Sequence, residues 1–259
     1  MPRRSLDQNL HELREYIRQM YIYVDDVLCQ ILQALKTGEQ TALSTMKQIE
    51  FLSQSYYTTA EKYTLRLLII QQPLAGRDLR YLTAALHIEM GLYLMSTLLS
   101  EITQIVLHLL AFKESTLSYI HMQGLSLYTI DATAVDSHGF ITELFVLRGL
   151  LDLGEDVRHI VQKTMQAFIQ NDISAARNAK DERVYVEQRY QQIYQDVMLM
   201  LSKQSALSVL QRDDSSILQR VMLLLFVSQK LAKIGHHNFD ICDHIIFVEE
   251  GEKETTDSQ

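Results

Sequence analysis

Apolar residues recur every three or four positions along most of the chain, which is the period of one face of an α-helix. Between residues 6 and 35 this stripe is broad and uninterrupted, and comparable stripes follow further along. No single helix of this kind can bury its stripe alone, so the pattern predicts an all-α protein of packed helices. The expected helices span residues 6–35, 40–70, 78–112, 140–171, 174–201 and 215–248.

Turn residues separate the expected helices. Pro73 is the only proline after Pro2, so it ends the second helix, and Gly76 follows it as a turn residue. Asp78 then stands where an N-cap residue is expected, which places Arg80 in the first turn of the third helix. Gly149 and Gly154 weaken the first half of the fourth helix and are candidate positions for a break.

The order of long helices repeats, which predicts two tandem antiparallel three-helix bundles. When the third helix is set on the sixth, Leu86 aligns with Leu225 and Ile102 with Ile241 without a gap. We expect a first bundle at residues 1–112, a linker at 113–139, a second bundle at 140–250 and an acidic tail at 251–259. The linker contains a short alternating segment, Leu125–Ile130, that is compatible with a strand or with extended chain.

Composition restricts the function. The net charge of -8 and the pI near 5.6 argue against nucleic-acid binding, which needs a concentrated basic face. Cys29 and Cys242 are the only cysteines, so neither a disulfide framework nor a thiolate metal site is indicated. The N-terminus lacks the apolar core of a signal peptide, and the strongest apolar run, Val221–Val227, is too short to span a bilayer. We expect a soluble protein of the cytoplasm.

Motifs of enzyme chemistry are absent from the sequence. It contains no phosphate-binding Gly-x-x-x-x-Gly-Lys loop, no Gly-x-Gly-x-x-Gly, no Gly-x-Ser-x-Gly and no His-Glu-x-x-His. It also has no Glu-x-x-His pair, which a di-iron carboxylate bundle would need on two helices. The sequence therefore predicts a protein that is not an enzyme.

Two segments resemble the signatures of a known family. Residues 71–80, Gln-Gln-Pro-Leu-Ala-Gly-Arg-Asp-Leu-Arg, are similar to the Gln-Pro-x-Ala-x-Asp-Leu-Arg motif of the PhoU proteins, with one extra residue before Asp78. Residues 231–243 and 246–251 resemble the signature of that family's second repeat. The resemblance covers most of the chain and implies two tandem three-helix bundles.

The resemblance also implies a function. PhoU proteins are accessory regulators of phosphate transport, so we expect a homodimeric adaptor for phosphate-dependent signal transduction. Its partners would be the ATPase subunit of a phosphate ABC transporter, a sensor histidine kinase, or both. Attachment to the inner face of the membrane would then come through the transporter. A scaffold that only oligomerises is a third interpretation.

The chain departs from the family at its metal-binding motif, a Glu-x-x-x-Asp pair in each repeat. By count from Asp78, the first pair falls on Tyr93 and Thr97, and the second falls on Ala232 and His236. These residues lack the paired carboxylates that iron and hard cations prefer. We therefore expect no metal in the first bundle, and no cofactor is expected in general.

A different polar set stands near the second pair. His236, Asp240, Asp243 and His244 lie at i, i+4, i+7 and i+8, so one helix face would carry two imidazoles and two carboxylates. This set suits a single transition metal such as zinc, nickel or copper, and a metal sensor or storage protein is the alternative function. The other interpretation is a polar face near a helix C-terminus, where histidines complement the helix dipole.

Overall fold

The computed structural model describes residues 2–39, 49–70, 74, 76–112, 140–207 and 215–251, and all the regular structure in these ranges is α-helical. The predicted all-α class is therefore confirmed. The possible strand at Leu125–Ile130, the turn residue Pro73 and the tail beyond Gly251 lie outside the described residues. The helices are α1 (Pro2–Thr37), α3 (Ile49–Ile70), α4 (Arg77–Leu110), α6 (Phe140–Gln170), α7 (Ile173–Asp181), α8 (Arg183–Leu207) and α9 (Ser215–Glu250).

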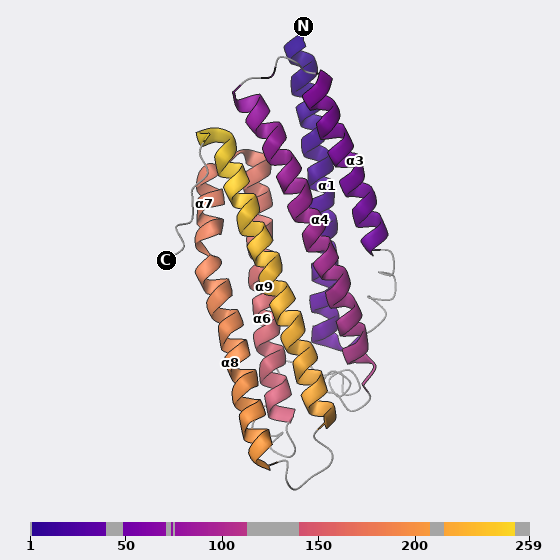
Figure 1. The fold of residues 1–259 in the computed structure, drawn as a ribbon, viewed down its shortest axis with the longest axis vertical. Helices are drawn as coiled ribbons and strands as arrows, with labels where there is room; N and C mark the ends of the chain where they lie inside the picture. Colours follow the sequence, from indigo (N-terminus) through magenta and orange to yellow (C-terminus); the bar gives the residue numbers. More distant parts are fainter. Residues whose placement is uncertain are drawn as a thin grey trace.

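The helices form two groups that meet along α4 and α9, which run side by side through the middle of the molecule (Figure 1). α1 and α3 pack on α4, while α6, α7 and α8 pack on α9. The contact between α4 and α9 is more extensive than that of any other described pair, and α1 also packs against α6. The buried apolar side chains of both groups join in one cluster. The division into bundles at residues 112 and 140 stays a prediction.

The predicted break in the fourth helix is wrong, because α6 is continuous through Gly149 and Gly154. Both glycines instead permit close helix contacts. A Cβ atom on Gly154 would lie 2.3 Å from Cδ2 of Leu32 on α1, and one on Gly149 would lie 3.2 Å from Cγ1 of Ile193 on α8. Glycine is used here because the neighbouring side chain occupies the space of a Cβ atom.

The fifth helix is divided, contrary to the prediction of one helix over residues 174–201. α7 ends at Asp181 and α8 begins at Arg183, with Glu182 between them. Asp172 caps α7, since its side chain accepts a hydrogen bond from the Ala175 amide at 3.0 Å. The break carries no proline or glycine, which is why the hydrophobic pattern did not indicate it.

Asp78 is not the N-cap of α4, which corrects the sequence prediction. The cap position is Gly76, at φ 59°, without a side-chain cap hydrogen bond, and Asp78 lies in the first turn. Arg80 is in that turn as predicted, and it reaches the end of α9. Its Nε donates to the Val248 carbonyl at 3.0 Å, and Arg77 pairs with Glu249. Arg77 and Arg80 thus tie the start of α4 to the last turn of α9.

α4 is, by length and composition, apolar enough to cross a membrane, and it alone among the described helices passes that test. Its apolar stretch exceeds Val221–Val227, the run named from the sequence. In this fold α4 is the central helix, with Leu82, Ile88 and Leu92 fully buried. In all, 44% of its apolar window is buried against the neighbouring helices.

Candidate functional site

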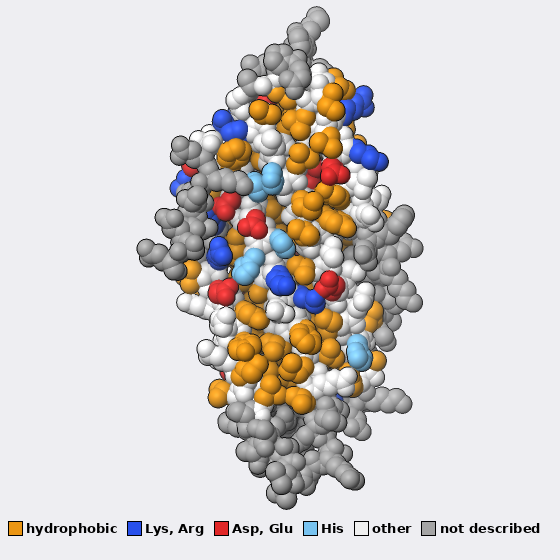
Figure 2. Space-filling view, in the orientation of Figure 1, with side chains coloured by type: hydrophobic (Ala, Val, Ile, Leu, Met, Phe, Trp, Pro, Cys, Tyr) orange, Lys and Arg blue, Asp and Glu red, His pale blue; other side chains and the backbone are white. Residues whose placement is uncertain are grey.

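A pocket of about 280 Å³ opens on the surface between α4 and α9, and we call it the seam pocket. Figure 2 shows histidine and acidic side chains gathered in the middle of this face. The pocket lies beside Gly91, where a Cβ atom would be 3.0 Å from Cγ1 of Ile241, so the glycine lets the two helices approach closely. Its lining residues are His87, Met90, Gly91, Leu94, His237, Asp240, Ile241, Asp243 and His244.

Histidines from both helix groups meet in the seam pocket. The ring of His87 on α4 stacks on the ring of His244 on α9, with centroids 4.2 Å apart and planes 23° apart. Nδ1 of His87 lies 2.8 Å from the Thr83 carbonyl oxygen, so this nitrogen carries the proton and donates. Burial lowers the pKa of His237 against the opposing attraction of Asp240, so His237 is neutral at neutral pH.

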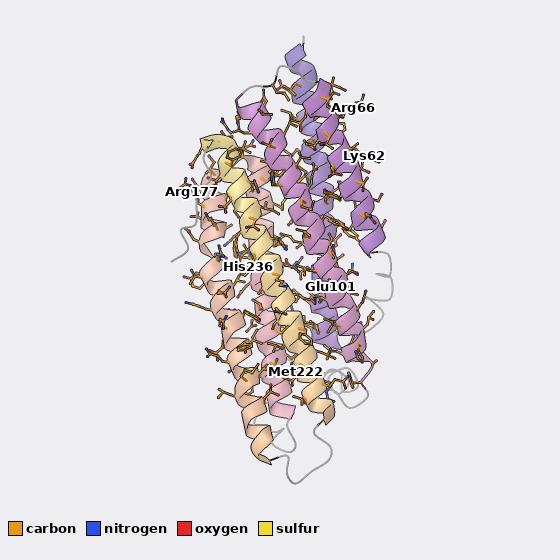
Figure 3. All side chains as sticks on the ribbon, viewed as in Figure 1. Lys62, Arg66, Glu101, Arg177, Met222 and His236 are labelled. Atoms are coloured by element: carbon orange, nitrogen blue, oxygen red, sulfur yellow. The ribbon has the colours of Figure 1, made fainter. Side chains whose placement is uncertain are left out.

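Three of the four residues predicted to share a metal contact partners on other helices. His236, labelled on α9 in Figure 3, does not line the pocket; its Nε2 lies 3.1 Å from Oε2 of Glu187 on α8. Asp243 pairs with Lys180 of α7 at 2.7 Å. His244 stacks on His87, as described above. Asp240 lines the pocket and forms no hydrogen bond or ion pair with the residues that the structure describes.

The metal hypothesis gains no support from this arrangement. Within the described ranges, no group of three or more His, Cys, Asp or Glu residues is placed to hold a metal ion. The sequence spacing suggested one shared helix face. Lys180 of α7, Glu187 of α8 and His87 of α4 instead each contact one of its side chains. These partners come from other parts of the chain, so spacing along one helix could not indicate them.

The positions of the family's carboxylate pairs do not fit a metal cluster either. The ring of Tyr93 stacks on Tyr57 of α3 with centroids 4.9 Å apart, and the Thr97 hydroxyl donates to the Tyr93 carbonyl at 3.2 Å. In the second pair, Ala232 is buried and has no donor atom in its side chain. The side chains at the first pair of positions are thus engaged in aromatic packing and a local hydrogen bond.

A buried glutamate is a titratable group that the sequence analysis missed. Glu89 of α4 has no exposed surface; its Oε1 accepts a hydrogen bond from the Thr64 hydroxyl of α3 at 2.7 Å. Its Oε2 has no hydrogen-bond partner among the described residues. Burial raises the pKa of Glu89 to about 7, helped by repulsion from Glu61 and opposed by Thr64. In the sequence, the only sign of this buried group is an acidic residue within the apolar stripe of the helix expected at residues 78–112.

The buried cysteine belongs to a polar network in the core. Sγ of Cys242 lies 3.2 Å from the Thr164 hydroxyl, which accepts a hydrogen bond from the Asn238 side-chain amide at 2.8 Å. Burial raises the pKa of the Cys242 thiol to about 12. A thiol with this pKa is not a nucleophile at neutral pH, so the network connects α6 to α9 rather than performing chemistry.

Solved structures with the same fold define the class of protein. PhoU from Pseudomonas aeruginosa superposes with a TM-score of 0.74 at 17% identity and covers 95% of this chain and 99% of its own. The phosphate transport system regulatory protein PhoU from Streptococcus pneumoniae gives a TM-score of 0.69 at 14% identity, over 96% and 98% of the two chains. The molecule is a helical-bundle protein with the PhoU fold.

Sequence comparisons give matches to the same class of protein. The model of the PhoU domain matches residues 150–245. A Clostridium acetobutylicum protein named phosphate-specific transport system accessory protein PhoU homolog is 17% identical over 253 residues, which are 98% of either chain. Residues 150–245 thus match the PhoU domain, and the chain as a whole has the fold of the PhoU structures.

Proposed function

We propose that this protein is a non-enzymatic accessory regulator of phosphate transport and of phosphate-dependent signalling. It would act by contacts with the ATPase subunit of a phosphate transporter, with a sensor histidine kinase, or with both. The main support is the match to a phosphate-specific transport accessory protein over 98% of both chains. A match of that extent includes both helix groups and the seam between them.

The described chemistry suits an adaptor better than an enzyme. The two groups whose pKa values are most displaced toward the neutral form, Glu89 and Cys242, are buried and do not line the seam pocket. Large apolar side chains are instead exposed on the outer helices, for example Ile69 of α3 at 75% and Tyr185 of α8 at 67%. Exposed aromatic and aliphatic residues of this kind are common where proteins meet.

We place the protein in the cytoplasm, with membrane attachment only through the transporter, and we expect a homodimer. The central position of α4 supports this placement, because its apolar length is used in the core. The net charge of -8 disfavours direct contact with nucleic acid or an anionic lipid surface.

Two measurements test the proposal. Phosphate uptake and a phosphate-responsive reporter are measured in cells lacking the protein and in wild-type cells as phosphate is varied. We expect both responses to differ between the two strains. The purified full chain is then mixed with the purified ATPase subunit of the phosphate transporter and with the sensor kinase. An ATPase subunit from an unrelated ABC transporter is the control. Unchanged uptake and signalling, together with no binding to either partner, would contradict the proposal.

A further inference from the structure

We propose that the seam pocket is a docking site for a partner protein that inserts one arginine side chain between α4 and α9. The inference rests on the proposed function insofar as that function acts through protein contacts. The pocket combines polar atoms of Asp240 and His87 with partly exposed apolar side chains, and Figure 2 shows histidine and acidic side chains gathered on this face.

The polar atoms of the pocket favour a cation with several N–H donors. Asp240 is exposed and has no ion-pair partner among the described residues, so its carboxylate is free to accept. The proton of His87 is on Nδ1, so in the neutral ring its Nε2 is an acceptor. Asp243 adds a second carboxylate, already balanced by Lys180. An anion would meet these carboxylates, and a metal ion would find no group of three ligands within the described ranges.

The apolar walls suit the stem of a long side chain. Met90 and Leu94 are 41% and 37% exposed at the rim, and the buried Ile241 forms the floor with Gly91. Arginine combines an aliphatic stem with a planar group that stacks on imidazole faces and binds a carboxylate through two parallel hydrogen bonds. The ammonium group of lysine neither stacks on an imidazole face nor binds a carboxylate through two parallel hydrogen bonds.

The size of the pocket favours an anchoring side chain over a free metabolite. Its volume of about 280 Å³ is at the lower edge of the range of about 300–1,000 Å³ that is usual for small-molecule sites. It is also open to solvent on one side, so a ligand held only there would keep much of its surface in water. A protein partner covers the opening and contacts the surroundings.

An apolar surface continues from the pocket along α9. Phe226 is 45% exposed and lies eleven residues before His237, which is three helical turns and so the same face. Figure 2 shows apolar side chains gathered below the pocket, over the part of α9 where Figure 3 labels Met222. A buried arginine beside a desolvated apolar surface is a common arrangement of binding hot spots.

The test titrates the full chain with a short capped peptide, acetyl-Ala-Arg-Ala-amide, and follows the imidazole signals by NMR. The matched control peptide carries citrulline, which has the shape of arginine without its charge. We expect shifts at His87, His237 and His244 with the arginine peptide, and at least about tenfold weaker binding with citrulline. Asp240→Asn should weaken the arginine peptide to a similar degree, whereas Asp196→Asn, at an exposed aspartate of α8, should not.

Three results would overturn the inference: no imidazole shifts with the arginine peptide, equal binding of citrulline, or binding unaffected by Asp240→Asn. Shifts produced by inorganic phosphate in place of the peptide would also contradict it, because they indicate an anion site. Capture of the ATPase subunit or the kinase separates the two proposals. If the wild type and Asp240→Asn capture a partner equally, docking at this pocket is wrong and the regulatory function stands. If neither partner is captured, the function fails, and the peptide titration alone decides the pocket.

Discussion

At the scale of single residues, Glu89 is the clearest case of a carboxyl group buried where its charged form is unfavourable. Its carboxylate is removed from water, has one hydrogen bond from Thr64 and is not near a compensating cation among the groups that shift its pKa. The neutral acid is therefore the form that the folded protein prefers. The consequence is a dependence of stability on pH that a surface glutamate would not produce.

The first prediction follows from the sign of this shift. The folded-state pKa of Glu89, about 7, is above its ordinary value of 4.5, so the folded protein holds a proton that the unfolded chain releases. The contribution is fully present below pH 4.5 and is lost as the pH rises toward 7. It amounts to up to about 3 kcal/mol. Urea unfolding at several pH values should show this decline, and Glu89→Gln should flatten it.

A matched control for that series is Glu101→Gln, at a half-exposed carboxylate of α4 that pairs with Lys230. We expect the free energy of unfolding of this variant to decline between pH 4.5 and 7 as it does in the wild type. Equal slopes for wild type and Glu89→Gln would show that Glu89 titrates like an ordinary surface carboxyl.

The second prediction concerns metal at the family's ligand positions. Tyr93, Thr97 and Ala232 offer no carboxylate, so untagged purified protein should contain no multinuclear iron by elemental analysis. His236→Ala should not change the metal content, because His236 pairs with Glu187 rather than with other ligands. His11→Ala serves as the comparison. Stoichiometric metal that depends on His236 would restore the histidine-face hypothesis.

At the scale of elements, the ends of α4 and α9 depend on each other. Arg80 donates to a carbonyl in the last turn of α9, where the helix leaves its own carbonyls without intrahelical partners. The third prediction is that Arg80→Ala lowers the free energy of unfolding by about 1.5–3 kcal/mol. Asp78→Ala should cost only about 0.5 kcal/mol, since Asp78 acts through the helix dipole and not as a cap. The reverse order in urea unfolding would reinstate Asp78 as the N-cap.

The fourth prediction tests the contact between α1 and α6. Gly154→Ala adds helix propensity worth about 1 kcal/mol, yet its Cβ atom would lie 2.3 Å from Leu32. We expect overpacking to dominate and the free energy of unfolding to fall by about 1–3 kcal/mol. The matched variant Gly149→Ala, whose Cβ atom would lie 3.2 Å from Ile193, should cost less. If Gly154→Ala stabilises the protein, the close approach of the two helices is wrong.

Helices with long apolar stripes were predictable from the sequence, and their interruptions were only partly so. The stripe over residues 6–35 identifies α1 because it follows from burial of one face. The break at Glu182 was missed because a chain of polar residues continues through it without a local signal. Gly149 and Gly154 were misinterpreted, since a glycine inside a helix has the same sequence appearance whether it breaks the helix or admits a neighbour.

The candidate site was predictable only in part, for a related reason. The sequence identified Asp240, Asp243 and His244 as one polar face, and all three do line the seam pocket. It could not identify His87, because that residue comes from another helix and reaches the pocket only through packing of α4 on α9. His236 was included by its spacing but is directed to α8 by Glu187.

At the scale of the whole molecule, the shared core along α4 and α9 makes the two helix groups one folded body with a long seam (Figure 1). In the first group, the Tyr57–Tyr93 stack occupies the place of the first expected carboxylate pair. In the second group, His236 pairs with Glu187. The PhoU fold is therefore present in a chain whose residues at these positions are not paired carboxylates.

The most direct test of the proposed function is binding of the purified full chain to the purified ATPase subunit of the phosphate transporter and to the sensor kinase, measured by calorimetry beside an unrelated ABC ATPase. We predict saturable binding to at least one of the two phosphate-system proteins and none to the control. Absence of binding to both, or equal binding to the control ATPase, would contradict a regulator that acts through specific protein contacts.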